Sequence, residues 1–153
     1  MVLAGDVGGT KVNLAHYTLE KGKLTRVLLQ TYPSREFVSL YAIVRVFLKE
    51  HPAPLAAAAI GIAGPVVEGR SRLTNLGWDV DAADLARDLR LEQVALLNDL
   101  EATAYGTLRL EDADAVVLQE GRPRHEGAIA VIAAGTGLGE GGVVWDGSGY
   151  RAL

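Results

Sequence analysis

Cysteine is absent from the 153-residue sequence, which also has only one methionine, two tryptophans and two phenylalanines. Without cysteine, neither a disulfide framework nor a thiolate metal site can form within the chain. Long apolar runs are missing too, and a run such as residues 55–60 is far too short to cross a bilayer. The three histidines have no metal-ligand spacing. These absences exclude disulfide-stabilised scaffolds, zinc–thiolate modules and helical membrane spans.

An excess of basic charge is also lacking. The 15 Lys and Arg residues are outnumbered by 19 Asp and Glu, so the net charge is −4 and the pI is near 5.3. This balance, without a basic stripe, predicts no nucleic-acid partner. The first residues show no basic segment followed by a long apolar one, so we expect no targeting segment, no membrane partner and a cytoplasmic location.

Apolar residues make up 49% of the sequence, as in a globular domain, and their periodicity predicts alternating strands and helices. The predicted strands cover residues 2–7, 11–19, 24–32, 55–62, 93–97, 115–119, 128–133 and 142–145, with a short hairpin joining 66–67 to 72–74. The predicted helices cover residues 34–50, 81–89 and 98–110, with Asp81 and Asn98 as N-caps. This order predicts an α/β fold, with a mixed β-sheet and flanking helices.

Two segments of the chain share one outline. Residues 2–16 and 129–145 each read as an apolar strand, a turn with glycine and threonine, and a second apolar strand. Internal similarity of this kind indicates a duplicated architecture. We therefore expect residues 1–110 to form one lobe and residues 111–153 to be the start of a second, similar lobe in a truncated chain.

The first glycine-rich turn, Gly5–Thr10, has the composition of a phosphate cradle. Glycines let backbone N–H groups approach a phosphate closely, Thr10 adds a donor, and Asp6 can hold Mg²⁺ directly or through water. An ordinary hairpin turn explains the same residues equally well. The second glycine-rich turn, residues 135–142, favours the cradle, because a duplicated fold would place two such turns on opposite walls of one cleft.

A dinucleotide-binding site is not favoured at the second turn. Gly137, Gly139 and Gly142 match the spacing G-x-G-x-x-G, but that fingerprint requires a helix directly afterwards. The sequence continues as Val-Val-Trp, which is typical of a strand.

Two further stretches carry candidate ligand residues. Asn98 and Asp99 follow a buried strand, the position at which α/β folds bind ligands. Asn98 can bind sugar hydroxyls, and the Asp99 carboxylate can orient a hydroxyl and take its proton, although a helix start also explains both residues. Thr74 and Asn75 lie shortly before Trp78. Their residue types fit either a turn or contact with a ligand.

Five segments taken together resemble the bacterial glucokinase family. They are GDVGGTK (5–11), IAGPV (62–66), LTNLGWDVDAADL (73–85), LLNDLEATAYG (96–106) and AAGTGLGEGG (133–142). The resemblance runs in order along nearly the whole chain. It implies the ribonuclease-H-like, actin-like ATPase fold of the sugar kinases. It also implies phosphorylation of glucose at its 6-hydroxyl with ATP and Mg²⁺, the first step of glycolysis.

The resemblance also implies roles for individual residues. The ATP-binding residues would be Gly5, Asp6, Val7, Gly8, Gly9, Thr10, Thr136, Gly137 and Gly139, with Asp6 on the side of the Mg²⁺. The substrate-binding residues would be Gly64, Pro65, Thr74, Asn75, Asn98, Asp99 and Gly137. Asp99 would be the catalytic base.

Two departures leave alternatives open. Leu100 stands where many relatives have phenylalanine, and Lys11 after Gly-Gly-Thr resembles the related repressor/ORF/kinase group. The repressors of that group add an N-terminal helix-turn-helix, for which a first strand at residue 2 leaves no room. The alternatives are a related hexose kinase of that group and a non-catalytic sugar- or nucleotide-binding fragment. The hexose, the phosphoryl donor and a homodimer remain open.

Overall fold

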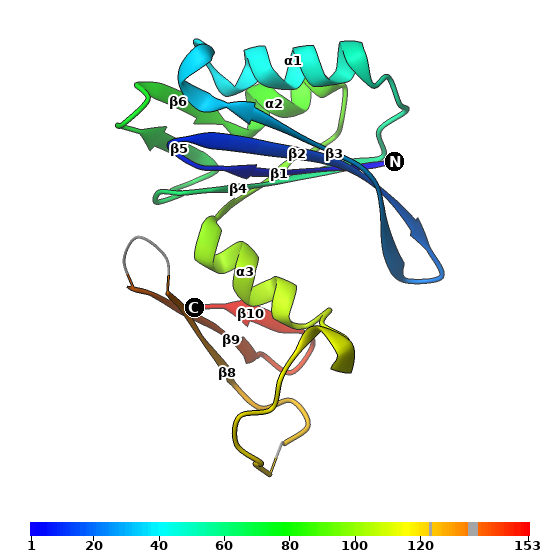
Figure 1. The fold of residues 1–153 in the computed structure, drawn as a ribbon, viewed down its shortest axis with the longest axis vertical. Helices are drawn as coiled ribbons and strands as arrows, with labels where there is room; N and C mark the ends of the chain where they lie inside the picture. The colour runs from blue at the N-terminus through cyan, green and yellow to red at the C-terminus, as the bar shows by residue number, and fades with distance from the viewer. Residues whose placement is uncertain (123, 135–137) are drawn as a thin grey trace. The chain divides into compact units, whose positions relative to one another are not determined.

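The computed structural model describes residues 1–122, 124–134 and 138–153 (Figure 1). Contacts divide the chain into two compact units, Met1–Asp99 and Leu100–Leu153. The boundary at residue 99 lies earlier in the chain than the expected boundary at residue 110, because helix α3 (Asp99–Thr107) packs mainly with the second unit. The Tyr105 hydroxyl accepts a hydrogen bond from the Ala152 N–H at 3.1 Å. The assignment of the units as lobes stays a prediction.

The first unit is built on a five-stranded mixed sheet in the order β3-β2-β1-β4-β7. The strands are β1 (Val2–Val7), β2 (Lys11–Glu20), β3 (Lys23–Pro33), β4 (Ala57–Ile62) and β7 (Ala95–Asn98). β1, β2 and β3 are antiparallel neighbours, while β4 pairs in parallel with both β1 and β7. The predicted mixed sheet is confirmed, and so is its antiparallel start.

Helices α1 (Leu40–Glu50) and α2 (Ala82–Leu89) lie on the same side of this sheet (Figure 1). The buried side chains of α1 recur at three- and four-residue spacing and include Leu40, Ile43 and Phe47. They join Leu3 and Ile60 of the sheet in one hydrophobic core. No helix in the described ranges is long and apolar enough to span a membrane.

The predicted helix over residues 34–50 begins later than expected. Residues Ser34–Glu36 form a short 3₁₀ turn, and α1 starts after Ser39, whose hydroxyl accepts a hydrogen bond from the Ala42 N–H at 3.2 Å. Ser39 is therefore the N-cap. Ser34 is instead fully buried and bonded to the loop after β1, which holds it outside the helix.

A hairpin of β5 (Arg70–Leu73) and β6 (Trp78–Asp81) connects the sheet to α2. The predicted pairing of residues 66–67 with 72–74 is wrong. A tight turn at Glu68 and Gly69, with φ of 50° and 73°, brings Val67 against Arg70, which leaves β5 to pair with β6. Asp81 caps α2 as predicted, accepting hydrogen bonds from Ala83 N–H at 2.7 Å and Asp84 N–H at 3.3 Å.

The second unit contains a three-stranded sheet in the order β10-β9-β8. The strands are β8 (Ile129–Ala134), β9 (Leu138–Trp145) and β10 (Tyr150–Ala152), and a 3₁₀ turn covers Asp112–Asp114. The strand order repeats that of β3-β2-β1, so the shared outline seen in the sequence corresponds to two similar antiparallel meanders. Because Gly139 and Gly142 lie within β9, a dinucleotide-binding helix is excluded there.

Two predictions in this unit are wrong. Helix α3 ends at Thr107 rather than at residue 110. Residues 115–119 form no strand, although Val116, Val117 and Leu118 have strand-like side chains. Within the described part of the chain these residues have no strand beside them, and 69–95% of each is exposed.

Candidate functional site

The predicted site residues of the first unit gather at one edge of its sheet. Strands β1, β4 and β7 run in parallel, and their last residues Val7, Ile62 and Asn98 are neighbours in the pairing register. The loops after β1 and β4 and the residue Asp99 after β7 therefore start side by side. Ligands bind at this edge in open α/β sheets, where the carboxyl ends of the strands meet. The expectation that Asn98 and Asp99 lie at a strand end is confirmed.

The loop Gly8–Thr10 is held to the protein by its carbonyl groups. The Ser34 hydroxyl donates to the Gly8 oxygen at 2.8 Å, and the Ser34 N–H donates to the Thr10 oxygen at 3.0 Å. The N–H groups of Gly9 and Thr10 donate to no group in the ranges that the structure describes. Since the carbonyls of Gly8 and Thr10 are bonded to Ser34 while the amides of Gly9 and Thr10 are left for another acceptor, the loop has the polarity that an anion cradle needs.

A pocket of about 250 Å³ lies beside this loop. Its lining residues come from three separate segments and are Gly9, Ala63, Gly64, Pro65, Arg72, Leu73, Thr74, Asn75 and Leu76. The candidates Gly64, Pro65, Thr74 and Asn75, chosen on separate sequence motifs, are thus brought together with Gly9 of the glycine-rich loop. Thr74 and Asn75 reach the pocket because they form the turn between β5 and β6.

Asn98 connects two of the predicted motifs. Its side-chain amide donates a hydrogen bond to the Gly64 carbonyl at 2.9 Å, so the end of β7 holds the loop that follows β4. Asp99 is the next residue and begins α3. The sequence had assigned Asn98 to sugar binding or helix capping, and the bond to Gly64 adds a structural role that neither interpretation included.

Asp6 is oriented by a short chain of hydrogen bonds across the sheet. The Asn13 amide donates to the Asp6 carboxylate at 3.0 Å, and the Thr31 hydroxyl donates to the Asn13 oxygen at 2.8 Å. Thr31 therefore fixes which end of the Asn13 side chain faces Asp6. Asp6 itself remains exposed, so its carboxylate can reach a ligand or a hydrated cation.

Two predicted loop glycines have packing roles. A Cβ atom at Gly5 would lie 2.6 Å from Ile60 Cδ1 and 3.1 Å from Leu14 Cδ2, so a larger residue there would force the buried Ile60 side chain to shift. In the second unit, a Cβ atom at Gly139 would lie 2.7 Å from Leu100 Cδ2. Thr136 and Gly137 lie outside the described residues. The ATP contacts expected of all these residues stay predictions.

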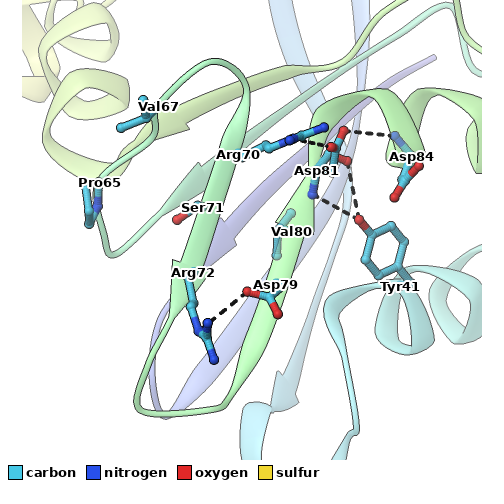
Figure 2. Close-up of a pocket in the computed structure, with 10 residues that line it drawn as sticks. All are labelled: Tyr41, Pro65, Val67, Arg70, Ser71, Arg72, Asp79, Val80, Asp81 and Asp84. Carbon is cyan, nitrogen blue, oxygen red and sulfur yellow. Dashed lines mark hydrogen bonds and ion pairs between the residues drawn. The ribbon is translucent and has the colours of Figure 1, made fainter.

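A second hollow, of about 640 Å³, lies on the β5–β6 hairpin (Figure 2). Its charged groups are paired: Arg70 contacts Asp81 at 2.7 Å, and Arg72 contacts Asp79 at 3.6 Å. The hydrogen bond from Arg70 holds the pKa of Asp81 below its usual value. Burial raises the pKa of Tyr41, whose hydroxyl accepts a hydrogen bond from the Asp81 N–H at 3.0 Å. These contacts anchor the base of the hairpin that carries Thr74 and Asn75.

Sequence reasoning missed several residues that shape the site. Ser34 was placed in a helix, and Tyr41, Arg70 and Asn13 were given no role. Their importance depends on partners 7–40 residues away in sequence. The only local signal was a serine at the start of the predicted helix, which also fits a cap.

The fold is that of the actin-like ATPase class, to which the sugar kinases belong. A glucokinase structure from an Antarctic psychrotroph superposes with a TM-score of 0.90 at 29% identity, covering 99% of this chain and 48% of that one. A glucokinase of the ROK family from Streptomyces griseus, solved with glucose and AMPPNP, shares the fold with a TM-score of 0.63 at 20% identity, covering 98% of this chain and 46% of that one.

The sequence comparisons agree. The family model for glucokinase matches residues 3–153, and the chain belongs to the glucokinase family. The glucokinase of Synechocystis sp. is 42% identical, covering 99% of this chain and 46% of its own length. The glucokinase of Nostoc punctiforme is 38% identical over 100% of this chain and 46% of its own length. The chain therefore spans about half the length of the curated relatives it matches.

Proposed function

We propose that the full-length protein is a glucokinase, which transfers the γ-phosphoryl group of ATP to the 6-hydroxyl of glucose. The observation that carries this proposal is the pocket beside the loop Gly8–Thr10. It joins the predicted sugar-binding segments to the predicted phosphate loop at the carboxyl ends of the strands. The relatives named above are glucokinases and support the same activity. The cytoplasm and the first step of glycolysis are the expected setting.

Asp99 is the proposed catalytic base. It follows directly on Asn98, which is tied to the pocket residue Gly64. Asp99 would orient the 6-hydroxyl and take its proton. Since the transition state of phosphoryl transfer is loose, positioning of this hydroxyl matters more than strong basicity. Asn98, Gly64, Pro65, Thr74, Asn75 and Gly137 would contact the hexose.

The nucleotide would be held by the two glycine-rich turns. Within Gly5–Thr10, Gly9 and Thr10 offer the N–H groups described above, and Thr136, Gly137 and Gly139 belong to the second turn. Mg²⁺ would neutralise charge on the phosphates. It is commonly held by one or two carboxylates together with phosphate oxygens and waters, so the exposed and oriented Asp6 carboxylate fits this role.

Purified full-length protein tests the proposal directly. Glucose and ATP are supplied with Mg²⁺, and glucose 6-phosphate is followed through NADPH formation by a coupling dehydrogenase. A glucose-dependent signal supports the glucokinase, and its absence overturns it. Mannose and other hexoses in the same assay, with product read as ADP release, distinguish the related hexose kinase. An active full-length protein also excludes the non-catalytic alternative. Sedimentation of the same sample tests the expected homodimer.

A further inference from the structure

Ser34 is fully buried, and all of its polar groups are engaged. Its hydroxyl donates to the Gly8 carbonyl and its N–H donates to the Thr10 carbonyl, at 2.8 and 3.0 Å. Its own carbonyl accepts a hydrogen bond from the Phe37 N–H at 3.3 Å. Ser34 thus binds the carbonyl groups of the residues on either side of Gly9, although it lies well outside the loop in sequence.

The bond to Gly8 sets the direction of the next amide. The peptide bonds of the described chain are trans, and in a trans peptide the C=O and N–H groups point in opposite directions. Because the Gly8 oxygen points at Ser34, the N–H of Gly9 points away from Ser34. Gly9 also lines the pocket, together with Gly64 and Pro65.

One other hydrogen bond holds the loop, from the Gly8 N–H to the Lys11 carbonyl at 2.9 Å, but it does not hold the peptide between Gly8 and Gly9. Neither Gly8 nor Gly9 has a positive φ, so no left-handed turn defines the backbone. Two adjacent glycines also leave rotation of the peptide between them almost unhindered. A hypothetical Cβ atom on Gly9 would meet nothing closer than Asn75 Nδ2, at 4.0 Å. The hydroxyl of Ser34 is therefore the contact that selects one orientation of this peptide.

We propose that Ser34 is a positioning residue for nucleotide binding, which fixes the Gly8–Gly9 peptide so that the Gly9 N–H is presented to a phosphate oxygen. Ser34 acts through the loop and does not touch the nucleotide. The inference rests on the proposed function, since the phosphate is that of ATP. It adds a residue from the turn after β3, a segment outside the motifs of the family resemblance.

The test compares two serine-to-alanine variants of the full-length protein. Ser34→Ala removes the hydroxyl that holds Gly8. Ser39→Ala, five residues further on, removes the N-cap of α1 and leaves the loop untouched. Both variants are expected to lower the melting temperature. The measurements are the dissociation constant of AMPPNP by calorimetry, and KM for ATP and for glucose.

Ser34→Ala is expected to weaken AMPPNP binding and raise KM for ATP about ten-fold, the factor that one lost hydrogen bond gives. KM for glucose should change less than about two-fold, because the pocket residues keep their contacts. Ser39→Ala should leave the nucleotide constants at the wild-type values. If the two variants bind AMPPNP equally well, Ser34 is only structural and the inference is overturned.

The same experiment separates this inference from the proposed function. A wild-type protein that binds AMPPNP but does not phosphorylate glucose contradicts the glucokinase, while the weakened binding of Ser34→Ala still supports the role of Ser34. A wild-type protein that binds no AMPPNP overturns the role of Ser34.

Discussion

The side-chain amide of Asn98 donates a hydrogen bond to the carbonyl oxygen of Gly64 at 2.9 Å. This bond joins the end of β7 to the loop after β4, two segments separated by 34 residues in sequence. Gly64 lines the pocket of the proposed sugar site. Asn98, itself a proposed sugar ligand, therefore also fixes the geometry of that pocket.

Asn98→Asp is expected to weaken glucose binding, although the shape of the side chain is kept. A carboxylate cannot donate to the Gly64 carbonyl and would repel it. The lost bond should also lower the free energy of unfolding by about 1–3 kcal/mol. Glucose titration by calorimetry and urea unfolding measure the two effects. Asn75→Asp is the matched control at the exposed pocket rim, where little stability should be lost. Wild-type glucose affinity in Asn98→Asp would contradict the prediction.

Asp99→Asn in the full-length protein is expected to abolish most phosphoryl transfer. The amide keeps the size of the carboxylate and can still contact a hydroxyl, but it cannot take the proton. The rate constant should fall about 10²–10⁴-fold, the usual contribution of a general base. Glucose affinity should stay close to that of the wild type. Turnover near the wild-type level would rule out Asp99 as the base.

Gly5→Ala is expected to destabilise the first unit because its methyl group would meet Ile60 Cδ1 at 2.6 Å. Forced packing of this kind costs about 1–3 kcal/mol. Ile60→Val removes the obstructing carbon, so the double variant should recover most of the stability lost by Gly5→Ala. Urea unfolding of the four proteins gives the coupling free energy. Additive losses would contradict the packing role.

The same double variant tests the ATP role of Gly5. If Gly5 serves packing alone, the double variant binds AMPPNP like the wild type. Weakened binding in a protein with restored stability would show a separate contribution of Gly5 to the nucleotide site.

His16 is expected to make the protein less stable in acid. Its ring is buried against Phe47, and burial lowers the pKa of His16, with His51 and the N-terminal amine adding repulsion. The unfolded chain therefore binds this proton more readily than the folded one. Stability is fully present above the ordinary value of 6.5 and decreases as the pH falls toward the lowered pKa.

His16→Phe should reduce this acid sensitivity, because phenylalanine keeps an aromatic ring beside Phe47 and cannot be protonated. The measurement is the urea midpoint between pH 8 and pH 5, with His125→Gln as the control at an exposed position. An equal loss of stability in the wild type and in His16→Phe would contradict the assignment.

Local patterns in the sequence predicted most of the first unit correctly. The alternation of apolar residues located β1, β2 and β3, and the three- and four-residue spacing located α1. Both signals work because the core lies on one face of each element. The start of α1 was misplaced because Ser34 and Ser39 are both plausible caps, and the choice is made by the contact of Ser34 with Gly8.

The candidate site could be predicted as a set of residues but not as an arrangement. Gly64 and Asn75 were chosen on separate motifs, and their meeting in one pocket follows from the β5–β6 hairpin, whose pairing was not predicted. The packing role of Gly5 was also hidden, since Ile60 is far away in sequence. Such roles depend on contacts between strands that sequence periodicity does not specify.

The strand order of the first unit has a consequence for synthesis on the ribosome. β1, β2 and β3 follow one another directly, so their antiparallel pairs are local and can form early. The parallel pairs β1–β4 and β4–β7 join strands that are separated by much longer stretches of chain. Of the five strands in this sheet, β7 is made last. The Gly64 carbonyl therefore acquires its donor only when the final strand docks. In a nascent chain released before that point, the loop after β1 would already be present. The loop after β4 would still lack the hydrogen bond from Asn98.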